Sequence, residues 1–233
     1  MTQKPLVFII SAPSGSGKST LTNELLKLVP HLDFSISYTT RTPRGSERNG
    51  KQYHFVTLEE FENMIQRGEF LEHANVHGNC YGTARQYLRE AGKNGHDLLL
   101  DIDIQGAAQI KRTLTDAISI FVLPPDRQTL EWRLRNRSED SEDVIQRRLL
   151  TASREIAEYY KYDYILINDR LEEACEKLRA IVLSERMRRS GPASPDEWKR
   201  NSELADRCRL ENARERVQPI LSSFGDPPPA AHL

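Results

Sequence analysis

Cysteine, net charge and long apolar runs are all scarce in this sequence of 233 residues. Its three cysteines, Cys80, Cys175 and Cys208, are odd in number, far apart and without metal-binding spacing. They therefore favour a reduced, cytoplasmic setting and no structural zinc site. Lysine and arginine (33) nearly balance aspartate and glutamate (34), so no overall field draws the chain to nucleic acid. Any anion that binds must be held by local charges.

The apolar runs are also short. The run LVFII at 6–10 is far below the length needed to span a bilayer. The N-terminal stretch enters this run directly and lacks the architecture of a signal peptide. We therefore expect no membrane association and a cytoplasmic protein.

Strand-like and helical patterns alternate along the chain. Helix 18–29 places Leu21, Leu25 and Leu28 on one stripe and ends before Pro30. The apolar, strand-like runs lie at 6–10, 97–104, 117–123 and 162–167, and a helical pattern follows each. This succession predicts an α/β fold, with a parallel sheet covered by helices on both faces.

Two inserts interrupt the alternation. Residues 35–83 contain β-like pieces at 53–56 and 70–76 around a short helix, which starts at a capping box of Thr57 and Glu60. Residues 126–159 are charged and helical in pattern, with a break at 135–143. We interpret the first as a β-rich, substrate-holding insert and the second as a mobile lid.

The character of the chain changes beyond Arg189. Residues 190–197 (SGPASPDE) are typical of a linker, a polar helix can extend to about residue 217, and 224–233 should be disordered. We therefore expect residues 190–233 to form a partly disordered C-terminal extension.

The stretch SAPSGSGKST at 11–20 is typical of a phosphate-binding loop between a strand and a helix. Gly15 and Gly17 let backbone N–H groups approach an anion, and Lys18 adds a positive charge. Ser19 can offer its hydroxyl to Mg²⁺. Ala12 replaces the first glycine of the pattern, at the end of the strand, where alanine is the smallest alternative. We expect the loop to tolerate it.

Asp101 and Asp103 come at the end of the apolar run 97–104. Period-two alternation would place both on one face, at the sheet edge where ligands bind. A carboxylate there can hold Mg²⁺ through water. Arg41, Arg44 and Tyr53 lie in the first insert, and Tyr81 and Thr83 lie in GNCYGT (78–83), which we interpret as a tight turn. Together they suggest a second phosphate pocket.

Several long motifs appear here in one order: SAPSGSGKST, SYTTRTPRGSERNGKQYHFV, EFLEHANVHGNCYGT, LLLDIDIQGA and FVLPP. In order and spacing they resemble guanylate kinases, from about residue 5 to residue 188. The resemblance implies a P-loop fold of three layers with a core (1–34, 84–125 and 160–189), a GMP-binding insert (35–83) and a lid (126–159). It also implies transfer of the γ-phosphate of ATP to GMP, with Mg²⁺ as the metal.

Site residues follow from the resemblance, motif by motif. It implies contacts to the GMP phosphate by Arg41, Arg44, Tyr53 and Tyr81, and reading of guanine by Ser37, Glu72, Thr83 and Asp103. It implies ATP contacts along the loop, at Ala12, Pro13, Ser14, Gly15, Ser16, Gly17, Lys18, Ser19 and Thr20, and on the adenine side at Asn168 and Asp169. Catalysis would then fall to Lys18, Arg41, Asp101, Arg137 and Arg148, with Mg²⁺ near Ser19 and Asp101.

Some alternatives stay open at this point. A catalytically silent guanylate-kinase-like module would bind a protein partner in place of GMP, and a related kinase would act on another small phosphorylated molecule. Arg133 also lies beside the break in the lid, although Arg137 and Arg148 are the stronger candidates. Ser138 follows Arg137 where the family often has glycine, and self-association into a homo-oligomer is left undecided.

Overall fold

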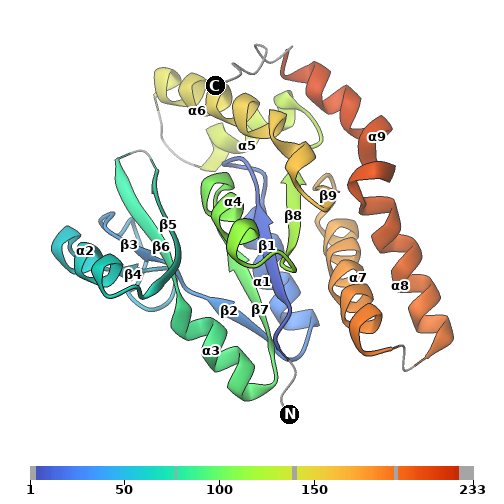
Figure 1. Cartoon of the computed structure of the whole chain (residues 1–233). Coiled ribbons are helices and arrows are strands. Elements are labelled where there is room, and N and C mark those ends of the chain that lie inside the picture. The colour runs from blue at the N-terminus through green and yellow to red at the C-terminus, as the bar shows by residue number, and fades with distance from the viewer. Residues whose placement is uncertain (1–3, 77, 138–140, 192–193, 226–233) are drawn as a thin grey trace. The chain divides into compact units, whose positions relative to one another are not determined.

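The computed structural model describes residues 4–76, 78–137, 141–191 and 194–225. The chain divides into two compact units. Figure 1 labels their helices and strands. The first contains Met1–Ile9 and Val29–Ile118, and the second contains Ile10–Leu28 and Ser119–Leu233. Strand β1 (Val7–Ser11) belongs to both units, and all five of its residues are buried. The predicted strand at 6–10 is therefore confirmed.

The first unit contains one half of a parallel sheet and a second, smaller sheet. The order in the first sheet is β2 (Leu32–Ser35), β7 (Asp97–Asp101) and β1, with β2 parallel to β7. The second sheet runs β4 (His54–Phe55), β3 (Tyr38–Thr39), β6 (Asn79–Ala84) and β5 (Phe70–Val76). Three helices complete the unit: α2 (Leu58–Gln66), α3 (Arg85–Asn94) and α4 (Ile104–Thr113).

The β-rich insert has a small core of its own. Phe61, Met64 and Phe70 are buried together, with Tyr38, Val56 and Cys80 packed against them. Helix α2 begins after Thr57, whose side chain accepts from Glu60 N at 3.1 Å, so the predicted helix start is confirmed. The tight turn predicted at 78–83 is wrong, because Asn79–Ala84 forms strand β6, antiparallel to β5.

The end of the strand at 97–104 also differs from the prediction. Strand β7 stops at Asp101, and Asp103 is the N-cap of α4, where its Oδ1 accepts from Gly106 N at 3.0 Å. The two aspartates therefore do not alternate along one strand. The strand ends here because the Asp103 side chain caps the start of α4, where the first backbone N–H groups have no partner within the helix.

The second unit contains the other half of the parallel sheet, in the order β1, β8 (Ile118–Leu123) and β9 (Tyr164–Ile167). Strands β8 and β9 are parallel, and β8 is buried throughout, as expected for a strand covered on both faces. Helix α1 (Lys18–Leu28) buries Leu21 and Leu25. Leu28, the third leucine of the predicted apolar stripe, is 47% exposed and does not belong to the buried face.

The segment predicted to be a lid contains α5 (Arg127–Arg137) and α6 (Glu142–Ala157), which we call the lid helices, and a short 3₁₀ turn follows at Tyr159–Lys161. The two helices share a core of Leu130, Leu134, Ile145, Leu149 and Ala152. Residues 135–137 and 142–143 of the predicted break belong to α5 and α6, and Ser138 lies outside the described residues.

The C-terminal extension is more ordered than predicted. Helix α7 (Leu171–Ser190) is followed by α8 (Pro195–Cys208) and α9 (Leu210–Ser223), in place of one polar helix to about residue 217. Ser194 caps α8 and Pro195 opens it, so half of the predicted linker belongs to a helix start. Of the segment predicted to be disordered (224–233), residues 226–233 lie outside the described residues. Among the helices that are described, none is both long and apolar enough to cross a membrane.

Candidate active site

The loop 12–17 connects β1 to α1 in the second unit. Gly15 and Gly17 have φ angles of +91° and +87°, in the left-handed region that favours glycine. Ser16 N donates to Pro13 O at 3.1 Å, which closes the loop, and Lys18 begins the helix. The loop thus meets the local requirements of a phosphate-binding loop. Ala12 does not interfere, because the two positive φ angles are at Gly15 and Gly17.

Asn168 holds this loop from the end of β9. Its side chain is buried, and its Nδ2 donates to Ser16 O at 2.7 Å. The backbone oxygen of Asn168 accepts from Arg133 Nη2 at 3.0 Å. Asn168 is thus joined to the loop backbone, a role that the sequence reasoning did not foresee, whereas its neighbour Asp169 is exposed.

Arginines of the lid reach the same loop. Arg148 on α6 donates from Nη2 to Ser14 Oγ at 2.7 Å. Arg133 on α5 has a buried Nη1 without a hydrogen-bond partner among the described residues. Because Arg133 is hydrogen-bonded to Asn168, which itself holds the loop, it becomes a stronger candidate than its place in the sequence indicated. Arg137 is the last residue of α5, and its side chain is not described.

Glu72 and Thr83 form the centre of the candidate site in the first unit. They are paired residues of the antiparallel strands β5 and β6, and both are buried. Thr83 Oγ1 donates to Glu72 Oε1 at 2.6 Å. Burial raises the pKa of the Glu72 carboxyl to about 7; the Thr83 hydrogen bond opposes this effect, and the charge of Asp103 adds to it. The site therefore holds a carboxyl group that ionises near neutral pH.

Gly106 of α4 closes one side of this carboxyl group. A Cβ placed on Gly106 would lie 2.6 Å from Glu72 Oε2 and 3.3 Å from Asp103 Oδ1. The predicted guanine readers Glu72, Thr83 and Asp103 are thus brought together, and Gly106 is a residue of the site that the sequence reasoning missed. The available signal was a glycine three residues after Asp103, within the motif LLLDIDIQGA.

Arg41 and two tyrosines form a second group in the first unit. Arg41 is 8% exposed, and its guanidinium lies 5.3 Å from the centre of the Tyr53 ring, which packs edge-on against Tyr81 at 5.8 Å. Burial, followed by the charge of Asp101, raises the pKa of Tyr53 to about 12, so this phenol stays protonated and can donate. Three of the predicted phosphate ligands are therefore neighbours.

The other predicted ligands of this group are placed differently. The Arg44 side chain is exposed, and its backbone N donates to Glu47 Oε2 at 2.8 Å. Glu47 also forms an ion pair with Arg41 Nη2 at 2.9 Å. The Glu47 carboxylate thus accepts from Arg41 Nη2 and Arg44 N, which could otherwise donate to a phosphate. The sequence analysis did not predict this role of Glu47. Ser37 is buried beside these strands, and its carbonyl accepts from His54 N at 2.9 Å.

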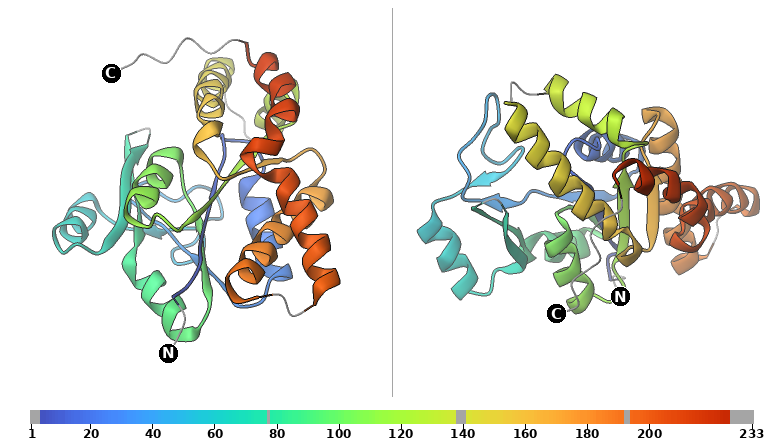
Figure 2. Two further views of the ribbon diagram at one scale, coloured as in Figure 1. Left: turned by 45° about the vertical axis from the view of Figure 1, so that its right-hand side comes forward. Right: turned by 90° about the horizontal axis from the view of Figure 1, so that it is seen from above.

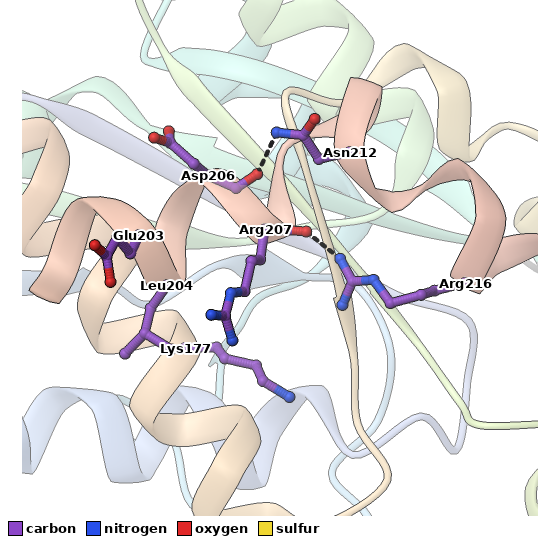
Figure 3. A pocket seen from close by; sticks show the side chains of 7 residues that line it. All are labelled: Lys177, Glu203, Leu204, Asp206, Arg207, Asn212 and Arg216. Atoms are coloured by element: carbon purple, nitrogen blue, oxygen red, sulfur yellow. Dashed lines mark hydrogen bonds between the residues drawn. The ribbon is translucent and has the colours of Figure 1, made fainter.

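A cavity of about 550 Å³ lies elsewhere, where α7, α8 and α9 meet (Figure 3). Lys177, Arg207 and Arg216 line it together with Glu203 and Asp206. The carboxylates offset most of the positive charge, so the cavity does not select a ligand of one sign. None of the predicted nucleotide-site residues lines it.

Known proteins match the chain closely. The guanylate kinase family model matches residues 3–185. The guanylate kinase of Koribacter versatilis is 56% identical over 223 residues, covering 94% of this chain and 96% of the relative. That of Geobacter metallireducens is 50% identical over 188 residues, covering 81% and 93%. The guanylate kinase crystal structure from Anaplasma phagocytophilum superposes with a TM-score of 0.67 at 34% identity, covering 80% of this chain and 88% of that one. The chain belongs to the guanylate kinase family.

Proposed function

We propose that this protein is a guanylate kinase that transfers the γ-phosphate of ATP to GMP, giving ADP and GDP. The observation that carries the proposal is the buried Glu72 carboxyl group, held by Thr83 at 2.6 Å beside Asp103. Guanine presents N1–H and its exocyclic amine as adjacent donors, which one carboxylate can accept together. Adenine has no such pair and would leave a buried carboxylate without a partner.

ATP binds to the second unit in this proposal. Backbone N–H groups of residues 12–20 surround its phosphates, and Lys18 adds a positive charge. Arg148, Arg137 and Arg133 neutralise charge on the transferred group, because phosphoryl transfer requires positioning and charge stabilisation more than covalent catalysis. Asn168 contributes by holding the loop at Ser16 O, and Asp169 lies on the adenine side.

GMP binds to the first unit. Arg41, Tyr53 and Tyr81 bind its phosphate together with Arg44, and Ser37 and Thr83 help to read the base. The Arg41–Glu47 ion pair must exchange partners when this phosphate arrives, because Glu47 holds Arg41 in the free protein. A phosphate oxygen of GMP, already ionised, then attacks the γ-phosphorus in line, so no general base is needed.

Mg²⁺ is the proposed metal. Ser19 offers a hydroxyl at the start of α1 and Asp101 offers a carboxylate at the end of β7, and both are the hard oxygen donors that Mg²⁺ prefers. Among the described residues no group of three or more His, Cys, Asp or Glu could hold a metal ion by itself. We propose that Mg²⁺ arrives with ATP and keeps several of its waters, as this ion usually does. It would neutralise charge on the phosphates.

An assay of ADP release, with GMP, AMP, CMP and UMP as acceptors, tests the proposal. We expect turnover with GMP that exceeds turnover with AMP by a factor of at least about 10⁴. The Lys18→Ala variant should lose activity and keep the fold. Equal turnover with AMP would reject the guanine pocket, and no turnover in the unmodified protein would favour the silent binding module.

The setting follows from the same reaction. ATP and GMP are the proposed partners, and purine nucleotide metabolism with recycling of GMP in the cytoplasm is the proposed role. The nearly balanced charge favours no nucleic-acid partner.

A further inference from the structure

The C-terminal extension is anchored to the edge strand of the second unit. Residues Tyr164 and Arg209 form an antiparallel bridge, and Leu210 N donates to Asp163 O at 3.1 Å. The Arg209 guanidinium lies 4.9 Å from the centre of the Tyr164 ring and donates to Glu185 Oε1 at 3.2 Å. Backbone pairing, a stacked cation and an ion pair thus fix the junction of α8 and α9 to β9 and α7.

From this junction α9 runs to the lid (Figure 2). Ala213, Val217 and Ile220 are buried at the i, i+4, i+7 spacing of one helix face. Helix α9 contacts β9, α5 and α6. The amphipathic pattern therefore packs the extension onto the second unit, and its far end lies at the lid helices.

The last residues of α9 contact the lid directly. Ser223 Oγ accepts from the backbone N of Arg127, the first residue of α5, at 3.0 Å. Phe224 packs against the lid core of Leu130, Leu134, Ile145, Leu149 and Ala152. A hydroxyl from another helix thus satisfies a free donor at the start of α5, and a phenyl ring covers the core that joins α5 to α6.

The same lid core reaches the phosphate loop. A Cβ at Gly15 would lie 2.9 Å from Leu134 Cδ2 and 3.0 Å from Leu130 Cδ1, so these leucines pack directly on the loop. Leu149 of this core directly follows Arg148 in α6, and Arg148 donates to Ser14 Oγ. Contacts therefore run without interruption from Phe224, through the lid core, to the residues that surround the ATP phosphates.

We propose that α8 and α9 form a brace that holds the lid helices against the phosphate loop, with Ser223 and Phe224 as positioning residues for ATP. The part that concerns ATP rests on the proposed function. The packing of α8 and α9 against the lid helices does not depend on that function. Because the junction of α8 and α9 is fixed to β9 and α7, moving α5 and α6 away from them would cost the Phe224 contact and the hydrogen bond at Arg127 N, which favours the docked lid.

Single substitutions in the full chain test the brace. The variants are Phe224→Ala, Ser223→Ala and the conservative Phe224→Leu, which keeps an apolar side chain on the lid core. Gln218→Ala is the matched control, because Gln218 is an exposed residue of the same helix. Hydrogen exchange of α5 and α6 and calorimetric binding of an unreactive ATP analogue and of GMP are measured for each variant.

Phe224→Ala should raise amide exchange in α5 and α6 about tenfold, by increasing their local opening. It should also weaken binding of the ATP analogue severalfold and leave GMP binding unchanged. Ser223→Ala should act most strongly on the first turn of α5, while Phe224→Leu restores most of the protection and Gln218→Ala changes nothing.

Unchanged exchange in α5 and α6 for Phe224→Ala would overturn the brace. An equal loss of affinity for GMP and for the ATP analogue would overturn the positioning role. These results are independent of turnover: should the unmodified protein fail to phosphorylate GMP, the proposed function fails, and the exchange data still decide whether the brace exists.

Discussion

Thr83 and Glu72 face each other across strands β6 and β5, and a 2.6 Å hydrogen bond runs from the threonine hydroxyl to Glu72 Oε1. Because one carboxylate oxygen is engaged by Thr83 and the other faces Gly106, this carboxyl group has a single defined orientation. Its environment is dry enough to raise its pKa to about 7. This site and the phosphate loop lead to five testable predictions.

The Glu72→Gln variant should lose affinity for GMP. The amide presents one donor where guanine also presents donors, and losing a charge-assisted pair of hydrogen bonds raises the KM for GMP about tenfold to a hundredfold. Thermal stability should be unchanged or higher, because a neutral group replaces a desolvated acid. Steady-state kinetics and melting curves check both, with Glu62→Gln on the exposed face of α2 as control. A KM for GMP equal to that of the control would contradict the assignment.

GMP binding should weaken as the pH falls through about 7, because protonated Glu72 cannot accept both guanine donors. Calorimetry between pH 8 and pH 6 should show affinity falling on the order of tenfold per unit below the pKa, while an ATP analogue is much less affected. A pH-independent GMP affinity would remove Glu72 from the pocket.

The same raised pKa affects the stability of the free protein. Whereas GMP affinity should rise with pH, the contribution of Glu72 to stability should fall. The folded state holds a proton on Glu72 that the unfolded state releases near 4.5, so the folded state binds more protons between about 4.5 and 7. The contribution of Glu72 to stability is therefore present below about 4.5 and is lost as the pH rises to about 7. Comparing the pH dependence of unfolding for the unmodified protein and Glu72→Gln isolates this contribution.

The Gly106→Ala variant should separate GMP binding from folding. Its methyl group would lie 2.6 Å from Glu72 Oε2 and force the carboxylate to turn, which raises the KM for GMP. Alanine within a helix favours folding over glycine by about 1 kcal/mol, so stability should not fall by the same mechanism. Gly92→Ala in α3 is the matched control, because its nearest neighbour, Pro5, is at an ordinary 3.5 Å. Equal KM values in the two variants would show that the Glu72 orientation is unimportant.

The Gly17→Ala variant should damage ATP binding selectively. The added methyl group overlaps Asn168 Nδ2, so the hydrogen bond from Asn168 to Ser16 O is lost, and the backbone has a φ of +87°. We expect affinity for an ATP analogue to fall at least about tenfold, with backbone strain on the order of 1 kcal/mol. Gly45→Ala is the control, because Gly45 also has a positive φ, of +50°, but a Cβ there would meet no atom within 4 Å. It therefore reports the effect of backbone strain without a steric contact. Should both variants bind the analogue equally well, the loop contact with Asn168 is not needed.

The local patterns predicted much of this fold because they depend on few neighbours. Alternation of apolar strands and amphipathic helices indicated β1, α1 and β8, and Thr57 indicated the start of α2. The errors occurred where two local structures compete. At Asp103 a helix cap replaced a longer strand, and at 79–84 strand pairing with β5 replaced a turn. Pairing partners that lie elsewhere in the chain decide such cases.

By itself the sequence determined the class of the protein: the positive φ angles of the loop require Gly15 and Gly17, and the long motifs resemble guanylate kinases from about residue 5 to 188. Only the tertiary structure decided which of these residues meet. It paired Arg41 with Glu47, joined Asn168 to Ser16 and placed Phe224 on the lid core. The reason is physical, because backbone conformation and amphipathic pattern are local properties. Burial of a charge and contact between distant side chains exist only once the chain has packed.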